Sequence, residues 1–342
     1  MISNINDLPL IPTSNISSNE DNLIRNIEYV QFTLFLITIP FYIFILYFIN
    51  RARLRKIEQL ATPFFILCLT TGIIDILNYL NNYLNSMFPK WAWGVGIFLY
   101  LDSYYAHVYF YIAWFTGLCQ VFSVAVVATN RLTAIIFPYR NNKLWSSRNL
   151  KIAIGVQFLP AALLTSATLF QPTQLYRNKN NGISPKFVNQ NTTSIFFKFC
   201  GVLLLIVCIY LIIGYVYLFL VLRRSAQQPN STSFRKLNIK TKRRDIKLLC
   251  MSSIVVVIQF LAFTFLVIAS IPRFVTLNLE EFYLIYNVVS DIYAGCNPYL
   301  LWIFSDSLRN YIFDELRLTK TSKRQKGGQV VTKTSAIMIH PV

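Results

Sequence analysis

The chain has 342 residues, of which 55% are hydrophobic and only 13% are charged, and its formal net charge is +18. A soluble globular domain carries roughly 25% charged residues, so this composition excludes an ordinary soluble fold. The apolar residues gather in blocks of about 20, the length that an α-helix needs to cross a hydrocarbon core of ~30 Å. The composition therefore indicates a helical membrane protein.

Seven such apolar blocks follow one another along the chain. They cover residues 29–49, 60–84, 93 or 101 to 137, 152–170, 195–222, 248–271 and 282–304. Each block is too long for a strand and lacks the alternating pattern of a membrane barrel, which leaves the helix as the only spanning structure. We expect an all-α bundle of seven transmembrane helices within residues 28–304.

Lysine and arginine are distributed unequally between the loops. They concentrate after the first, third, fifth and seventh blocks, as in the run Arg51, Arg53, Arg55 and Lys56. Basic loops stay in the cytosol, so the N-terminus is predicted to lie outside the cell. The same loops suit anionic membrane lipids, whereas no soluble basic surface for nucleic acid is evident.

Three segments flank the predicted bundle. Residues 1–27 form a polar tail that we expect outside the cell. In residues 305–318, Leu308, Ile312 and Leu316 recur at helical spacing with charges opposite, which predicts a short amphipathic helix on the inner membrane surface. Residues 319–342 are basic and rich in Ser and Thr, and we expect a disordered cytoplasmic tail.

Glycosylation and cysteine patterns agree with this topology. Asn15 and Asn191 begin sequons on the predicted outer side, whereas the sequon at Asn230 lies on the inner side and is expected to stay unused. All six cysteines fall inside apolar blocks, so no outer disulfide is expected. Without a Cys/His cluster, the sequence supports no metal site, and nothing in it calls for a cofactor.

A few polar residues stand inside the apolar blocks. Asp75 lies in the second block, and Asp291, Asn297 and Pro298 lie in the last. A carboxylate in a membrane span must face a partner, a cation or water. One interpretation is a hydrated functional core between the helices, and the other is a single structural hydrogen bond. Pro298 removes a helical hydrogen bond and predicts a kink near Asn297.

Arg131 ends the long third block, directly after Asn130 and shortly before Pro138. Arginine at a membrane boundary is costly and is often functional, here as a charge offered to a cytosolic partner. The alternative is an arginine that snorkels to the lipid headgroups. The sequence contains no nucleophile–base arrangement, phosphate-binding loop or paired acids, so we do not expect an enzyme.

These motifs together resemble a known family. The chain is similar to the nematode chemosensory serpentine receptors of the Srg superfamily, either class V (Srv) or the neighbouring class gamma (Srg). The residues that carry the resemblance are Asn130-Arg131-Leu132-Thr133-Ala134, Phe137-Pro138, Leu144-Trp145, Asp75 and Asn297-Pro298-Tyr299. The resemblance spans nearly the whole chain in topology, but its sharp motifs cover only the third helix, the loop after it and the last helix.

The resemblance implies a G-protein-coupled receptor in the plasma membrane, specifically in the cilia of sensory neurons. A heterotrimeric G protein would bind around Asn130, Arg131 and Pro138. An external small-molecule or peptide ligand would bind among the outer halves of the third, fifth, sixth and last helices. Candidate ligand contacts are His107, Tyr111, Trp114 and Asp291, although aromatic residues on a membrane helix also serve packing.

Two departures separate the chain from rhodopsin-like receptors. Asn130 replaces the acidic residue that usually precedes the arginine, and Leu301 stands where the Asn-Pro motif of the last helix usually ends in tyrosine. A membrane channel or transporter is the alternative function, since buried acids would suit one. Against it, the sequence has no internal repeat and no matched pair of broken helices.

Overall fold

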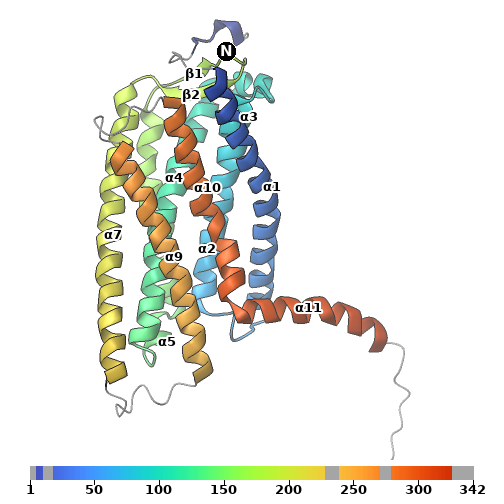
Figure 1. Ribbon diagram of the computed structural model, residues 1–342, viewed down its shortest axis with the longest axis vertical. Helices are drawn as coiled ribbons and strands as arrows, with labels where there is room; N and C mark the ends of the chain where they lie inside the picture. The colour runs from blue at the N-terminus through green and yellow to red at the C-terminus, as the bar shows by residue number, and fades with distance from the viewer. Residues whose placement is uncertain (1–4, 11–17, 228–238, 270–278, 326–342) are drawn as a thin grey trace, which may run out of the picture.

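A computed structural model of the protein describes residues 5–10, 18–227, 239–269 and 279–325. In this part of the chain, seven long helices run side by side as one bundle (Figure 1), which confirms the predicted fold class. They are α1 (Ser18–Leu54), α2 (Pro63–Asn82), α4 (Val95–Ile136), α6 (Ser147–Thr165), α7 (Gln190–Gln227), α9 (Ile239–Ala269) and α10 (Leu279–Phe304). A β-hairpin lies at one end of the bundle and a further helix, α11 (Asp306–Gln325), lies at the other.

The helices have the length and composition of membrane spans. Among the described residues, five helical stretches are long and apolar enough to cross a membrane, and α9 adds a shorter apolar stretch, Ile246–Ala262. Large apolar side chains also cover the outside of the bundle: Leu159, Leu163 and Ile213 are 64%, 74% and 64% exposed. Exposed apolar surface on this scale fits contact with lipid and does not fit a monomer in water.

Several helices extend past the apolar blocks that predicted them. α1 begins at Ser18 inside the predicted polar tail, and α9 begins at Ile239 in the basic segment before its apolar block. Polar residues continue a helix outside the hydrocarbon because its backbone hydrogen bonds are local. The third span was predicted to begin at residue 93 or at residue 101. α4 begins at Val95 and is broken at Asp102 (φ 46°, ψ −125°), so a structural feature lies close to each predicted start.

Shorter elements connect the long helices. α2 continues into a π-helical turn and then a single helical turn, α6 ends in a 3-10 turn, and a short helix lies between α4 and α6. The connecting elements are η2 (Tyr83–Met87), α3 (Phe88–Lys90), α5 (Asn141–Leu144) and η3 (Ser166–Phe170). One further short element, η1 (Ile5–Asp7), precedes α1.

The loop between α6 and α7 folds as an antiparallel hairpin that the helix-only prediction missed. β1 (Thr173–Arg177) pairs with β2 (Ile183–Phe187). Leu10, far away in the sequence, forms a parallel bridge with Arg177 on the other edge of β1. Leu8 is 4% exposed and packs with Leu175 and with α4, so residues 5–10 and the hairpin form one cap over this end of the bundle.

The main apolar core lies toward the other end of the bundle. Ile45 of α1, Phe64 of α2, Leu248 of α9 and Leu308 of α11 all belong to this core. Close van der Waals packing of such side chains holds these helices together, because lipid tails are as apolar as the side chains and supply no hydrophobic force between helices. Part of the apolar face of α11 therefore packs on protein: Leu308 and Ile312 are at most 1% exposed, whereas Phe313 and Leu316 are each 48% exposed.

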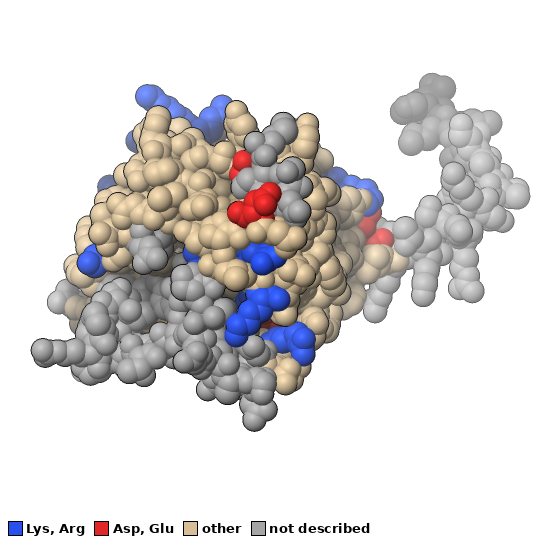
Figure 2. Space-filling model, turned by 90° about the horizontal axis from the view of Figure 1, so that it is seen from above, with Lys and Arg blue, Asp and Glu red and all other residues tan. Residues whose placement is uncertain are grey.

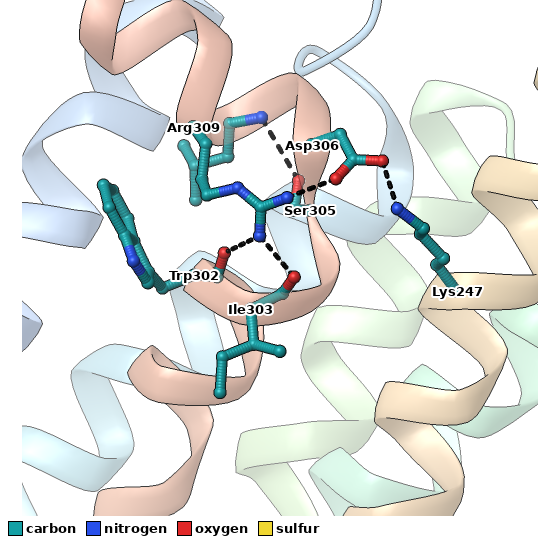
Figure 3. A network of polar contacts seen from close by, with 7 residues as sticks. Lys247, Trp302, Ile303, Ser305, Asp306 and Arg309 are labelled. Atoms are coloured by element: carbon teal, nitrogen blue, oxygen red, sulfur yellow. Dashed lines mark hydrogen bonds and ion pairs between the residues drawn. The ribbon is translucent and has the colours of Figure 1, made fainter.

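Polar contacts fix α11 at the lower end of the bundle, where it runs sideways (Figure 1). Arg309 donates to the backbone carbonyls of Trp302 and Ile303, which end α10 without helical partners, and to Asp306 (Figure 3). Lys247 of α9 reaches the same Asp306 carboxylate at 2.5 Å. The network joins the N-terminal half of α9 to the junction of α10 and α11.

A second ionic contact holds the middle of α11. Glu315 accepts hydrogen bonds from Arg51, and from Arg55 at 2.5 Å, so it ties α11 to the end of α1. α11 also continues to Gln325, beyond the predicted end at residue 318. The predicted disordered tail therefore begins as helix, and its residues 326–342 lie outside the described part of the chain.

Candidate functional site

Asp75 is the centre of a polar network inside the bundle. Its carboxyl group is 1% exposed and accepts three hydrogen bonds, from Tyr42 Oη at 2.6 Å, Gln120 Nε2 at 2.8 Å and Asn297 Nδ2 at 2.7 Å. The network therefore joins α1, α2, α4 and α10. A buried polar group that loses its hydrogen-bond partner costs about 1–3 kcal/mol, so this network constrains the relative positions of the four helices.

The sequence predicted part of this network. Asp75 and Asn297 were expected to share a polar core, and the structure brings them together directly beside Pro298. Tyr42 and Gln120 were not foreseen. Gln120 offered a signal that could have been used, because an amide inside a membrane span needs a partner almost as much as a carboxylate does.

Asp291 does not join this network. Its carboxylate accepts from Tyr83 Oη at 2.6 Å and from Asn82 Nδ2 at 3.2 Å. Tyr79 Oη donates to the backbone carbonyl of Asp291 at 2.6 Å. These partners come from the last turns of α2 and the π-helical turn η2, so Asp291 fixes the upper end of α10 to the upper end of α2.

A cavity of about 110 Å³ lies between the helices on the hairpin side of Asp75. Side chains of α2, α4, α7, α9 and α10 line it, including Asn78, Trp114, Phe197 and Tyr286. The ligand was expected among the third, fifth, sixth and last helices, and this cavity is lined by those helices together with the second. Ligand sites in helical bundles are built in this way from facing helices.

Of the candidate ligand contacts, Trp114 is part of the lining of this cavity, and His107, Tyr111 and Asp291 are not among its described lining residues. Tyr111 lies parallel to Phe115, with ring centroids 5.9 Å apart. Both rings belong to α4, so this contact is packing within one helix. Trp114 packs against Phe197 of α7, with ring centroids 5.0 Å apart.

The cavity and the Asp75 network share a residue. Gln120 lines the cavity, and its amide nitrogen donates to Asp75. Tyr293 of α10 also lines the cavity, and its hydroxyl donates to Gln259 Oε1 of α9 at 3.2 Å and to the backbone carbonyl of Gln120 at 3.4 Å. A molecule in the cavity therefore touches groups that hold α4, α9 and α10 together.

A second cavity of about 30 Å³ includes Tyr42 and Asn297 in its lining. It also touches Thr71, Ser123 and Ser252, so its walls carry hydroxyl groups. Tyr215 of α7 donates to Ser252 at 3.1 Å. Polar side chains thus continue from the Asp75 network toward α7 and α9 in the half of the bundle that bears Arg131.

Arg131 is buried in the bundle, with only 6% of its surface exposed. Its Nη2 donates to Asn130 Oδ1 at 2.6 Å, and its guanidinium carbon lies 3.9 Å from the centroid of the Phe64 ring on α2. A guanidinium over an aromatic face is attracted by the ring quadrupole. This position inside the protein does not fit the snorkelling alternative.

The loop after α4 folds back onto the helix. Pro138 follows the last residues of α4, and Trp145 Nε1 donates to Thr133 Oγ1 at 2.8 Å. Asn130, Arg131 and Pro138, the predicted G-protein contacts, therefore share one end of α4. Asn130 and Arg131 are buried there, whereas Pro138 is partly exposed.

Of the predicted glycosylation sites, Asn191 lies in the first turn of α7, is exposed, and belongs to the hairpin end of the bundle. Asn15 and Asn230 lie outside the described residues. Among the described residues, no group of three or more His, Cys, Asp or Glu side chains could hold a metal ion.

Comparison with known proteins identifies the family. The sequence profile of the serpentine type 7TM GPCR chemoreceptor Srv family matches residues 31–318. Serpentine receptor class V-1 of Caenorhabditis elegans is 30% identical over 119 residues, which cover 35% of this chain and 37% of that relative. The match to the Srv profile decides between the two classes that the motifs left open. The chain belongs to the Srv family of serpentine seven-transmembrane chemoreceptors of the G-protein-coupled type.

Proposed function

We propose that the protein detects an external chemical in the α4–α10 cavity and activates a heterotrimeric G protein at the α11 end of the bundle. It acts in the plasma membrane with its N-terminus outside. Placement in the cilia of sensory neurons rests on the family alone. The small volume of the cavity favours a small molecule over a peptide.

The charge distribution supports this orientation. At the α11 end, Arg51 and Arg53 lie in the last turn of α1, and Arg140 and Lys143 follow α4. Figure 2 looks onto the hairpin end, where the visible described surface is mostly uncharged and carries both basic and acidic side chains. Basic residues are retained on the cytosolic side of a membrane, so the α11 end faces the G protein.

The observation that carries the proposal is that Gln120 both lines the cavity and donates a hydrogen bond to Asp75. A ligand in the cavity contacts the same side chain that holds Asp75 to α4. Asp75 in turn holds Asn297 next to Pro298, where α10 lacks a helical hydrogen bond. A ligand shifts the balance between two packings of the bundle only by its differential affinity for them, and Gln120 gives it a contact that differs between the two.

The other end of the proposed pathway is Arg131. In the described packing its guanidinium is buried over Phe64 and bonded to Asn130. A second packing that releases the guanidinium from Phe64 offers a permanent charge and a fork of donors to the G protein.

The test is a ligand screen in cells that express the chain, with calcium or cAMP as the readout. For each active compound, Gln120→Leu should abolish the response at equal surface level. Gln157→Leu is the matched control, because Gln157 is also a buried glutamine but lies on α6, outside the lining of the cavity. An unchanged response in Gln120→Leu contradicts the proposed pathway.

Coupling itself is tested by repeating the screen in cells that lack all heterotrimeric G proteins. Loss of every response supports the receptor function. An ionic current or solute flux that persists in those cells contradicts it and favours the channel or transporter alternative, to which the family match gives no support.

A further inference from the structure

The lining of the α4–α10 cavity contains no Asp, Glu, Lys, Arg or His among the described residues. Asp291, a predicted ligand contact, is not among these lining residues, and its two carboxylate oxygens accept hydrogen bonds from Tyr83 and Asn82. A charged ligand would lose its hydration in the cavity and find no opposite charge. The cavity therefore selects against ammonium and carboxylate ligands.

Most polar groups in the lining already have partners. Asn78 accepts from Thr116 at 2.9 Å and donates to Ser290 at 3.2 Å, and Gln120 Nε2 donates to Asp75. Gln259 differs. It is 1% exposed, its Oε1 accepts from Tyr293, and its Nε2 has no hydrogen-bond partner in the described part of the chain.

A buried amide nitrogen without an acceptor is costly, and a native site usually supplies the missing partner. Tyr293 engages the oxygen of the Gln259 amide, which leaves the N–H groups available. The group that satisfies them must be a hydrogen-bond acceptor. In a cavity without charged residues, an acceptor of low hydration cost is a carbonyl or ether oxygen.

The remaining walls are apolar and aromatic. Trp114, Phe197 and Tyr286 line the cavity with aromatic rings, and Val121 and Leu204 add aliphatic surface. The cavity volume of about 110 Å³ limits the ligand to a small molecule. The shape and chemistry suit a small apolar molecule.

We propose that the cavity binds a small, uncharged, mainly apolar molecule, and that Gln259 donates a hydrogen bond to its carbonyl or ether oxygen. This inference rests on the proposed function, because it names the ligand class of the same site. It excludes amines and carboxylic acids, which are charged at neutral pH.

The test measures binding to the full-length receptor purified in lipid nanodiscs, by the ligand-dependent rise in the thermal unfolding midpoint. The probes are octan-2-one, nonane, heptanoate and octylammonium, which have equal numbers of non-hydrogen atoms. We expect octan-2-one to bind about two- to tenfold more tightly than nonane, the ratio that one neutral hydrogen bond supplies, and the two ions to bind more weakly than the ketone.

Gln259→Leu and Gln259→Met should both remove the preference for the ketone over nonane. Gln157→Leu, the buried glutamine on α6, should leave this preference unchanged. If Gln259→Leu fails to fold, the comparison of the four probes on the native receptor still decides the ligand class. The inference is overturned if nonane binds as well as the ketone, if either ion binds as tightly, or if the folded Gln259 variants keep the preference.

The binding test needs no G protein, so it separates the two proposals. Ketone binding through Gln259 without G-protein turnover in cells contradicts the proposed function and leaves the ligand class intact. G-protein turnover in response to a charged compound, with no ketone binding, supports the proposed function and contradicts the proposed ligand class.

Discussion

The guanidinium of Arg131 on α4 lies 3.9 Å from the centroid of the Phe64 ring on α2. Asn130, which stands where rhodopsin-like receptors carry an acid, contributes a neutral hydrogen bond to the same guanidinium. An aromatic ring therefore contributes to the restraint that an ion pair provides in those relatives. Four predictions test the proposed pathway between this contact and the hairpin end.

Phe64→Leu should raise the basal rate of G-protein turnover. The substitution removes a desolvated cation–π contact worth about 2 kcal/mol, which corresponds to roughly a 30-fold shift between two packings. Phe65→Leu is the control, because Phe65 is equally buried on the same helix and has no cation–π contact in the described residues. Nucleotide exchange in membranes, normalised to surface level, measures the effect. Equal basal rates in the two variants would contradict this role for Phe64.

Arg131→Ala should abolish G-protein activation while surface expression and ligand binding persist. Arg131→Lys should restore only part of the activity, because a compact ammonium lacks the planar fork of donors. Surface level, binding and nucleotide exchange are to be measured in the same cells. Normal signalling by Arg131→Ala at equal surface level contradicts the proposed mechanism.

Asp75→Asn should lower both stability and ligand response. Asparagine cannot accept at both side-chain positions, so at least one of Tyr42, Gln120 and Asn297 loses its partner, at a cost of about 1–3 kcal/mol. Thermal unfolding of the purified receptor measures the first effect, and ligand-stimulated nucleotide exchange measures the second.

Asp291→Asn is the matched control for Asp75→Asn. It removes a carboxylate whose partners come from α2 and the adjoining turn η2, so it should reduce stability and leave the ratio of stimulated to basal exchange near that of the native receptor. If Asp291→Asn lowers the ratio of stimulated to basal exchange as much as Asp75→Asn does, the response does not depend specifically on the contact between Gln120 and Asp75.

Asn191 should carry a glycan when the receptor is made in a secretory host, and Asn230 should not. The exposed first turn of α7 belongs to the hairpin end, which we place outside the cell. Glycosidase treatment of Asn191→Gln, Asn15→Gln and Asn230→Gln, followed by gel mobility, identifies the occupied sites. A shift that depends on Asn230, or a C-terminal epitope that stains in intact cells, contradicts the orientation.

The apolar blocks predicted all seven long helices, because hydrocarbon permits few other structures. Their ends were less accurate: α9 begins at Ile239 and α11 continues to Gln325, since polar helix ends carry no hydropathy signal. The hairpin could not be predicted in the same way. Its strands are short, and β1 depends on a distant partner, Leu10.

Part of the candidate site could also be predicted, because polar groups inside a membrane span need partners. Asp75 and Asn297 stand out because a carboxylate or amide in a span needs a partner, and they do meet. Gln120 and Gln259 carry the same signal, but which helix supplies each partner depends on packing that one sequence does not encode locally. His107 and Tyr111 were expected as ligand contacts on the outer half of the third helix, but neither is among the described lining residues of the cavity.

The cap at the hairpin end also determines how mechanical load passes into the receptor. A pull on the N-terminal segment acts on the Leu10–Arg177 bridge and hence on the hairpin. Phe187 of the hairpin stacks on Phe110 of α4 at 4.1 Å between ring centroids, so the load reaches the helix that carries both Trp114 and Arg131. A force applied to the N-terminal segment is therefore transmitted to α4 through the hairpin, whereas the ionic contacts of α11 join it to α1 and α9.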